Sequence, residues 1–180
     1  ILLDAYLDDT EDLLAGSRIE GPWALRLDVG RPADKPLLDK SDLDNYAKPL
    51  AQRLGNPDLV SVWCTKAHSE ASFVRLEPAR ATEAPAQDIV IAAPTAGWDR
   101  PDHRYHQQIH QAVAALPPLP PDRAVCLELA FVVPSSWKWW NFWKPTIDGL
   151  VHLLGHSGTA RPFDPLDGRI TELGMHLTPD

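Results

Sequence analysis

The chain is poor in cysteine, in long apolar runs and in basic charge. Its two cysteines, Cys64 and Cys126, lie far apart without a second cluster of metal-type ligands. This excludes a disulfide framework and a zinc site, and it is typical of a reducing, cytoplasmic location. No apolar run approaches the roughly 18 residues of a membrane span, so we expect no contact with a membrane. Lysine and arginine number 17 against 25 aspartates and glutamates, a formal net charge of −8, which argues against a protein that coats nucleic acid.

Other patterns with a known chemistry are missing as well. The sequence has no glycine-rich loop that would cradle a phosphate and no Ser-His-Asp arrangement. His106 and His110 have the i,i+4 spacing of helical metal ligands, but no glutamate lies between them and no third ligand is evident, so a solvated helix face is the preferred interpretation. Residues 1–20 carry −5 of the net charge and the remaining 160 residues only −3, which leaves DNA binding open.

What the sequence does contain is an internal repeat. Residues 23–29 and 124–133 alternate apolar and polar side chains like half-buried strands, and both lead to a proline and then to a helix. The two helices match at a constant offset of 96, share the pattern Asn-x-x-Lys-Pro and end before a glycine expected to cap them. The pairs at this offset are Asn45 with Asn141, Lys48 with Lys144, Pro49 with Pro145 and Leu54 with Leu150, and the expected capping glycines are Gly55 and Gly155.

The repeat predicts two strand-helix-strand units in one chain. We therefore expect an α+β fold (mixed α/β) with two half-domains, residues 1–80 and 88–180, joined by a linker at 81–87. Because the sequence opens at Ile1, the strand of the first unit that would correspond to 88–92 is expected to be missing. The other expected elements are helices at 2–15 and about 102–115, second strands at 59–66 and 169–176, and the strand at 88–92.

The strongest chemical signal precedes the first helix of the repeat. Asp42 and Asp44 lie two residues apart near the helix N-terminus and can converge on one Mg²⁺ ion, which prefers carboxylate oxygens. Lys48, one turn further on the side of Asp44, would stabilise charge on a phosphate. Asp58, at the start of the next strand, is the expected third acid. A plainer reading remains open, in which Asp44 only caps the helix and Lys48 is its solvated partner.

The order of these elements resembles the RusA family of Holliday junction resolvases. The family motif D-x-D-N-x-x-K falls on Asp42, Asp44, Asn45 and Lys48, but only Asp58 of the later acidic pair is present. The resemblance implies a Mg²⁺-dependent endonuclease, with Mn²⁺ as a substitute ion, that hydrolyses phosphodiesters in branched DNA and serves recombination and repair. Family members are homodimers, so the two units here would form a pseudo-dimer within one chain that can act as a monomer. The residues expected to contact DNA are Lys40, Asn45, Lys66 and Lys144.

The second copy retains only part of this pattern. Lys138 and Trp140 replace the first two acids, so we expect this half to be degenerate and a single intact site to nick one strand. Asp167 matches the acidic turn before the last strand and is an expected metal ligand, and a composite site that uses Asp164 or Asp167 with the first-half acids is a variant of the hypothesis.

Two further interpretations concern partners and activity. The Trp-rich segment 137–144 is expected to fill the interface between the halves rather than to stack on bases or to bind a partner. A protein of different class also fits the sequence, namely a catalytically silent RusA-fold module that binds nucleic acid or acts as a scaffold, since one half has lost its acids and fold does not fix function.

Overall fold

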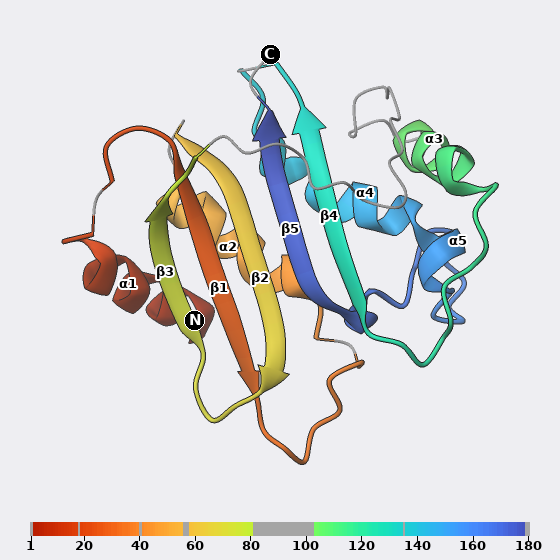
Figure 1. Ribbon diagram of the computed structural model, residues 1–180, viewed down its shortest axis with the longest axis horizontal. Coiled ribbons are helices and arrows are strands. Elements are labelled where there is room, and N and C mark those ends of the chain that lie inside the picture. The colour runs from red at the N-terminus through yellow and green to blue at the C-terminus, as the bar shows by residue number, and fades with distance from the viewer. Residues whose placement is uncertain are drawn as a thin grey trace.

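One five-stranded sheet runs through the whole molecule. The structure, a computed structural model, describes residues 2–17, 19–39, 41–55, 58–80, 103–134 and 136–178. The strand order is β3-β1-β2-β5-β4, and the sheet is mixed (Figure 1). The strands are β1 (Trp23–Arg31), β2 (Leu59–His68), β3 (Phe73–Pro78), β4 (Val125–Val132) and β5 (Ile170–Thr178).

The helices cover one face of this sheet (Figure 1). Along β1 the odd-numbered residues from Trp23 to Val29 are buried beneath the helices, whereas Arg26 and Asp28 on the other face are half-buried. This alternation is the period-2 pattern of a sheet with one covered face. No helix among the described residues has the length and apolar character needed to cross a membrane. The helices are α1 (Leu2–Leu14), α2 (Leu43–Leu54), α3 (Arg104–Val113), α4 (Trp143–Gly149), α5 (Val151–Leu154) and the 3₁₀ turns η1 (Trp139–Asn141) and η2 (Asp167–Arg169).

Two units of the same connectivity meet at the centre of the sheet. β1 and β2 are parallel and α2 connects them, while β4 and β5 are parallel and the α4–α5 segment connects them. The two units join through β2 and β5, which pair antiparallel with Trp63 opposite Gly174. The predicted mixed α+β architecture is therefore confirmed, and both units contribute to one sheet.

Most expected elements are present, with three differences. β3 was not predicted, although its residues alternate in character, and it pairs antiparallel with β1. The second repeat helix is interrupted at Leu150, whose ψ of 12° separates α4 from α5. Of the two capping glycines only Gly155 has a positive φ, 84°, whereas Gly55 has φ −65°. The linker 81–87 and the strand expected at 88–92 lie outside the described residues.

The Trp-rich segment packs inward, as expected for an interface filler. Trp139 and Trp143 are 3% and 0% exposed, and their rings meet edge to face at 4.9 Å. The indole N–H of Trp139 donates to the backbone oxygen of Leu59 at the start of β2, 3.1 Å away. Trp137 alone is clearly exposed, at 47%, and stacks on Phe142. Burial of the two central rings excludes a partner surface made by the whole segment.

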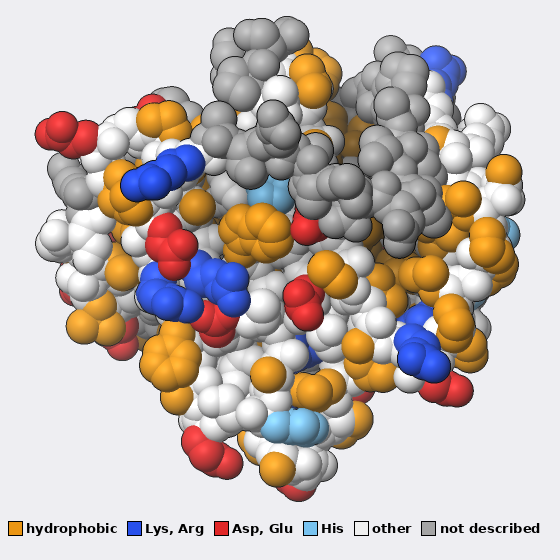
Figure 2. All heavy atoms as spheres, viewed as in Figure 1, with side chains coloured by type: hydrophobic (Ala, Val, Ile, Leu, Met, Phe, Trp, Pro, Cys, Tyr) orange, Lys and Arg blue, Asp and Glu red, His pale blue; other side chains and the backbone are white. Residues whose placement is uncertain are grey.

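The uncovered face of the sheet is ion-paired rather than basic. Asp28 accepts hydrogen bonds from Arg26 and Arg75, each at 2.9 Å, and from the hydroxyl of Thr65 at 2.6 Å. Figure 2 shows Lys and Arg side chains interleaved with Asp and Glu on this face, among hydrophobic side chains. Because Arg26 and Arg75 share Asp28 and lie among further acidic side chains, the described part of this face offers no strip of unpaired positive charge for a phosphate backbone.

Candidate composite acidic site

The candidate site lies where the end of β2 adjoins the start of β5. Thr65 pairs with Glu172 there, so Lys66 of the first unit comes next to η2 of the second. The N-terminus of α2 reaches the same place, because Lys66 also contacts Ser41, the residue before Asp42. Acidic residues separated by more than 120 positions in the sequence thus meet beneath one end of the inner strands β2 and β5.

Asp42 is the N-cap of α2, but its side chain does not cap the helix. It has extended backbone angles, and its carboxylate accepts a hydrogen bond from Nδ2 of Asn45 at 2.9 Å. Its carboxyl group also lies within hydrogen-bonding reach of that of Asp167. The plainer interpretation, in which Asp44 caps the helix, is wrong, because Asp42 occupies the N-cap position and Asp44 lies in the first turn of the helix and is 3% exposed.

Lys144 on α4 is the cation at the centre of the group. Its ammonium forms ion pairs with Asp167 of η2 and, at 3.0 Å, with Asp148 one turn along α4. It also exerts the largest favourable charge effect on Asp44, which is only 3% exposed. Although burial alone would lower the pKa of Lys144, the carboxylates of Asp44, Asp167 and Asp148 raise it above its ordinary value. This residue is therefore a permanent positive charge inside the cluster.

The cluster keeps an excess of negative charge even so. When all four are ionised, the carboxylates of Asp42, Asp44, Asp148 and Asp167 face only two ammonium groups, those of Lys66 and Lys144, so that two negative charges are unmatched in this fully ionised state. Burial and the neighbouring carboxylate of Asp167 raise the pKa of Asp42 to about 7. Burial also raises the pKa of Asp44 to about 6, against the opposing effect of Lys144. The charge pattern is that of a site which gains from taking up protons or a cation.

These shifts predict how stability depends on pH. Because the folded-state pKa of Asp44 lies above its ordinary value of 3.8, the folded chain binds this proton more tightly than the unfolded chain. The free energy of unfolding therefore falls as pH rises from about 4 through 6, and the loss is complete above that range. We expect Asp44→Asn, measured in EDTA by thermal denaturation, to be more stable than the wild type at pH 8 by on the order of 1–3 kcal/mol.

The difference should shrink towards zero below about pH 3, where Asp44 is neutral in both the folded and the unfolded chain. Asp34→Asn, at a loop residue whose side chain is 72% exposed, is the control and should follow the wild type at every pH. A constant difference across the pH range would contradict the assigned cause.

Asp58, the expected third acid, lies elsewhere. Its backbone oxygen accepts a hydrogen bond from Trp23 N at the start of β1, and its side chain is exposed. The twelve residues of α2 separate it from Asp42 by about 18 Å along the helix axis. The prediction that Asp58 completes the cluster is therefore wrong, and the third carboxylate is Asp167 of the second unit, as the composite variant of the hypothesis expected.

The lysines also differ from expectation. Lys66 is 3% exposed and Lys144 is held in ion pairs with Asp148 and Asp167, so neither presents an unpaired ammonium group at the surface. Lys48 is half-buried on α2, and the cation with the largest effect on Asp44 is Lys144 instead. Asn45 is exposed and holds Asp42. Lys40 lies outside the described residues.

Two further acids of the second unit, Asp148 and Asp164, differ in their relation to the cluster. Asp148 was not predicted as a site residue, although its i,i+4 spacing from Lys144 on a helix was a usable signal. Asp164 stays at the margin: it is exposed, accepts hydrogen bonds from Ser157 and Thr159, and has a pKa lowered by them.

The equivalent position at the other end of the β2–β5 pair is built differently. Trp139 lies against the start of β2 there, and the ring of Trp140 packs against Gly55 so closely that a Cβ atom at this glycine would come within 3.2 Å of it. Indole rings thus occupy the end of the interface at which the second unit has Lys138 and Trp140 in place of the two acids.

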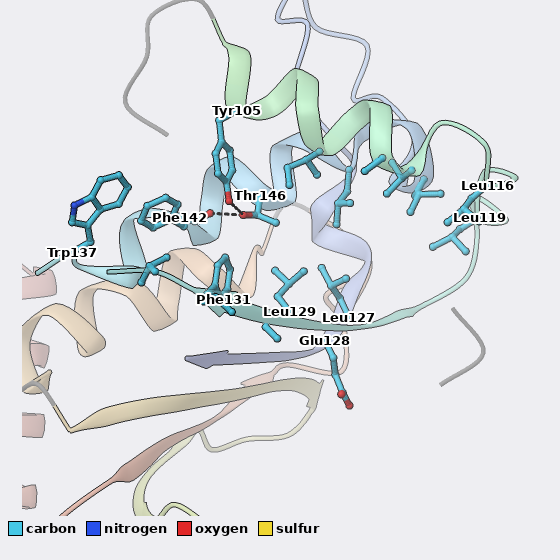
Figure 3. A pocket seen from close by; sticks show the side chains of 18 of the residues that line it. Tyr105, Leu116, Leu119, Leu127, Glu128, Leu129, Phe131, Trp137, Phe142 and Thr146 are labelled. Atoms are coloured by element: carbon cyan, nitrogen blue, oxygen red, sulfur yellow. Dashed lines mark hydrogen bonds between the residues drawn. The ribbon is translucent and has the colours of Figure 1, made fainter. Parts of the chain in front are cut away.

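A separate cavity of about 650 Å³ lies between α3 and β4 (Figure 3). Its walls are apolar except for a few groups such as the hydrogen-bonded hydroxyls of Tyr105 and Thr146, and the side chain of Glu128 points away from it (Figure 3). α4 divides it from the acidic cluster, because Thr146 and Leu150 face the cavity whereas Lys144 and Asp148 lie on the opposite side of the helix. The cavity therefore takes no part in the chemistry of the cluster.

Within the described ranges, no three His, Cys, Asp or Glu side chains already enclose a position for a metal ion, and this includes His106 and His110. In the acidic cluster the ammonium of Lys144 lies between the carboxylates. No protein-family model, curated protein or solved structure matches the chain. Its function is therefore inferred from the geometry and charge of the cluster.

Proposed function

We propose that the chain is a Mg²⁺-dependent, structure-selective DNA endonuclease of the RusA type that uses one composite site. The observation that carries the proposal is the convergence of half-buried Asp42 with buried Asp44 and Asp167, from both strand-helix-strand units, in a cluster with two unmatched negative charges when all its acids are ionised. Structural ion-pair networks are usually neutral, because unmatched buried charge destabilises a fold. A site that keeps such charge is a functional-site candidate.

The donor set fits a hard divalent cation. Asp42, Asp44 and Asp167 would hold the ion, since Mg²⁺ prefers carboxylate oxygens and a charge of +2 matches the excess of the cluster. Such an ion supplies Lewis acidity towards the scissile phosphate and activates water for attack. Raised pKa values of Asp42 and Asp44 fit ligands whose charge is balanced only when a cation is bound.

The other residues orient these ligands and the phosphate. Lys144 provides a fixed positive charge next to the ligands and stabilises negative charge that develops on the phosphate oxygens. Asp148 holds Lys144 through their ion pair, and Asn45 holds the carboxylate of Asp42. Each partner limits the rotation of a side chain that acts directly.

The arrangement of the two units supports an intrachain pseudo-dimer of RusA-like halves. Each unit has two parallel strands linked by a helix, and the two meet through the antiparallel β2–β5 pair, as two protomers do about a two-fold axis. One end of this interface carries the acids and the other carries Trp139 and Trp140. We infer a single incision in one strand instead of the paired cuts of a symmetric resolvase.

A second candidate function is a catalytically silent module that binds nucleic acid or acts as a scaffold. The ion pairs of Lys144 favour it, because an ammonium held between Asp148 and Asp167 neutralises carboxylates that a metal would need. The net charge of −8 also favours it. In this case the cluster is a buried salt-bridge network that fixes how the two units pack.

Cleavage of labelled four-way junctions and linear duplexes separates the two candidates. With Mg²⁺, the nuclease proposal predicts a nick in one strand of the junction, slower cleavage of the linear duplex and no cleavage in EDTA. Paired symmetric cuts would contradict the single-site inference. Absence of cleavage with both Mg²⁺ and Mn²⁺ would support the silent module.

A further inference from the structure

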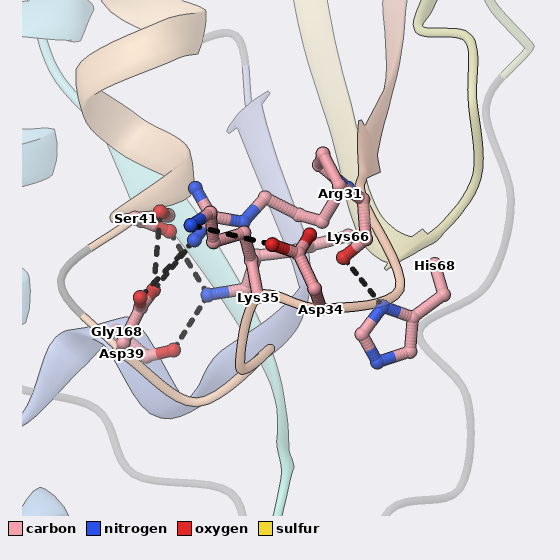
Figure 4. A network of polar contacts seen from close by, with 9 residues as sticks. Arg31, Asp34, Lys35, Asp39, Ser41, Lys66, His68 and Gly168 are labelled. Carbon is pink, nitrogen blue, oxygen red and sulfur yellow. Dashed lines mark hydrogen bonds and ion pairs between the residues drawn. The ribbon is translucent and has the colours of Figure 1, made fainter.

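Lys66 is buried at a position that DNA does not reach. It lies near the end of β2 with its side chain on the helix-covered face, and the residue is 3% exposed. Its ammonium donates hydrogen bonds to two backbone oxygens, that of Ser41 at 2.9 Å and that of Gly168 at 2.6 Å (Figure 4). Burial of an ammonium costs several kcal/mol unless hydrogen bonds and opposite charges offset it, so these bonds have a structural purpose.

The two oxygens belong to the two segments that carry the cluster. Ser41 directly precedes Asp42, and Gly168 directly follows Asp167. A single side chain therefore connects the loop before α2 in the first unit with η2 in the second. The carboxylates of Asp42 and Asp167 also act on the charge of Lys66, which places the ammonium next to the acids without an ion pair to either in the described structure.

A second set of bonds makes the first of these segments rigid. Arg31 at the end of β1 donates from Nη2 to both carboxylate oxygens of Asp39, at 3.2 and 3.1 Å, and the hydroxyl of Ser41 donates to Asp39 at 3.2 Å (Figure 4). Ser41 is thus held from β1 through Asp39 and from β2 through Lys66. The position of Asp42 is fixed relative to the sheet, and its position relative to Asp167 then depends on Lys66.

We propose that Lys66 is a positioning residue that sets the separation of the Asp42 and Asp167 carboxylates across the two units. This inference rests on the proposed function, because the separation matters only if these carboxylates bind one cation. Loss of the ammonium would free η2 from the α2 loop and would also add one unmatched negative charge, so the two acids would move apart. A residue that orients a ligand in this way typically changes metal affinity or activity by about 10- to 100-fold.

Lys66→Met removes the ammonium and keeps much of the side-chain volume. We expect two quantities to fall by about 10-fold or more, namely its Mn²⁺ affinity, measured by electron paramagnetic resonance, and its kcat for nicking of the four-way junction. Its KM for DNA should stay within about twofold of the wild type. Saturating Mn²⁺ should restore part of kcat. Lys35→Met is the control, because Lys35 lies in the loop between β1 and α2 and its side chain is 58% exposed. It should keep the wild-type Mn²⁺ affinity and kcat.

A rise in KM with kcat and Mn²⁺ affinity unchanged would show that Lys66 contacts DNA and would overturn the proposal, as would wild-type values throughout. If Lys66→Met does not fold, Lys66→Gln, whose amide can still donate to a backbone oxygen, is measured in the same way and should show a smaller loss in the same two quantities. A wild type that binds Mn²⁺ without cleaving DNA would contradict the nuclease proposal alone, and the Mn²⁺ affinity of the variant still decides the role of Lys66. A wild type that binds no Mn²⁺ would overturn both.

Discussion

Replacing Asp44 by asparagine should abolish Mg²⁺-dependent nicking of a four-way junction while leaving the protein folded and more stable at pH 8. Asp44 is 3% exposed and its pKa is raised to about 6, so its carboxylate is buried without full compensation. Asparagine keeps the shape and removes the charge that a cation needs. Loss of an outer partner of a metal ligand already costs about 10- to 100-fold, so we expect a fall in kcat of at least roughly 100-fold.

The combination of lost activity and gained stability distinguishes a functional acid from a structural one. If Asp44 were part of a salt-bridge network that holds the units together, its removal would leave Lys144 with one fewer partner and would lower the melting temperature. Near wild-type cleavage by Asp44→Asn would contradict the site assignment. Reduced stability at pH 8 would contradict the assigned destabilisation by the Asp44 carboxylate and would favour a structural role for Asp44 in the salt-bridge network.

Replacing Asp167 by asparagine should be as severe for cleavage, although this residue belongs to the second unit. Its carboxyl group meets that of Asp42 and forms an ion pair with Lys144. A site made only from the first unit would not depend on it. We expect a loss of kcat of at least roughly 100-fold on the junction substrate, measured under single-turnover conditions at saturating Mg²⁺.

Two matched aspartate variants serve as controls for this prediction. Asp164→Asn changes an acid three residues before Asp167 in the sequence, whose carboxylate accepts hydrogen bonds from Ser157 and Thr159. Asp58→Asn changes the acid that the sequence favoured as third ligand. Both should cleave within about threefold of the wild type, since surface substitutions of this kind have small effects. Loss of activity in Asp58→Asn with retention in Asp167→Asn would contradict a composite site.

Local patterns in the sequence predicted the strands and helices that build the site. Alternation of apolar and polar residues located β1, β2, β4 and β5, and the shared Asn-x-x-Lys-Pro pattern located α2 and α4. These signals depend on neighbouring residues, which sequence spacing describes directly. β3 was missed because it is short and mostly exposed, so its pattern shows little burial.

The third acid of the cluster was mispredicted because its position depends on strand pairing. From the sequence, Asp58 is the nearest acid after α2, but a helix of about 18 Å carries the chain to the opposite end of β1 and β2. Asp167 reaches Asp42 only because β5 pairs antiparallel with β2 in a particular register. Register between distant strands is set by packing of the whole sheet and is not encoded in local spacing.

The roles of the lysines were mispredicted for a related reason. Lys66 and Lys144 were expected to contact DNA on the resemblance to the RusA family, which does not describe the surroundings of the two side chains in this fold. Lys66 is buried because its ammonium donates hydrogen bonds to two backbone oxygens, whereas Lys144 is half-buried among three carboxylates. Neither set of partners is visible before the two units are brought together.

The central claim is that acids from both units form one site for a divalent cation, and Mn²⁺ anomalous diffraction from soaked crystals tests it most directly. The account predicts one anomalous peak in the cluster, with carboxylate oxygens of Asp42, Asp44 and Asp167 about 2.1 Å away and no peak beside Asp58. An empty cluster at saturating Mn²⁺, or a peak held by acids of one unit alone, would contradict it.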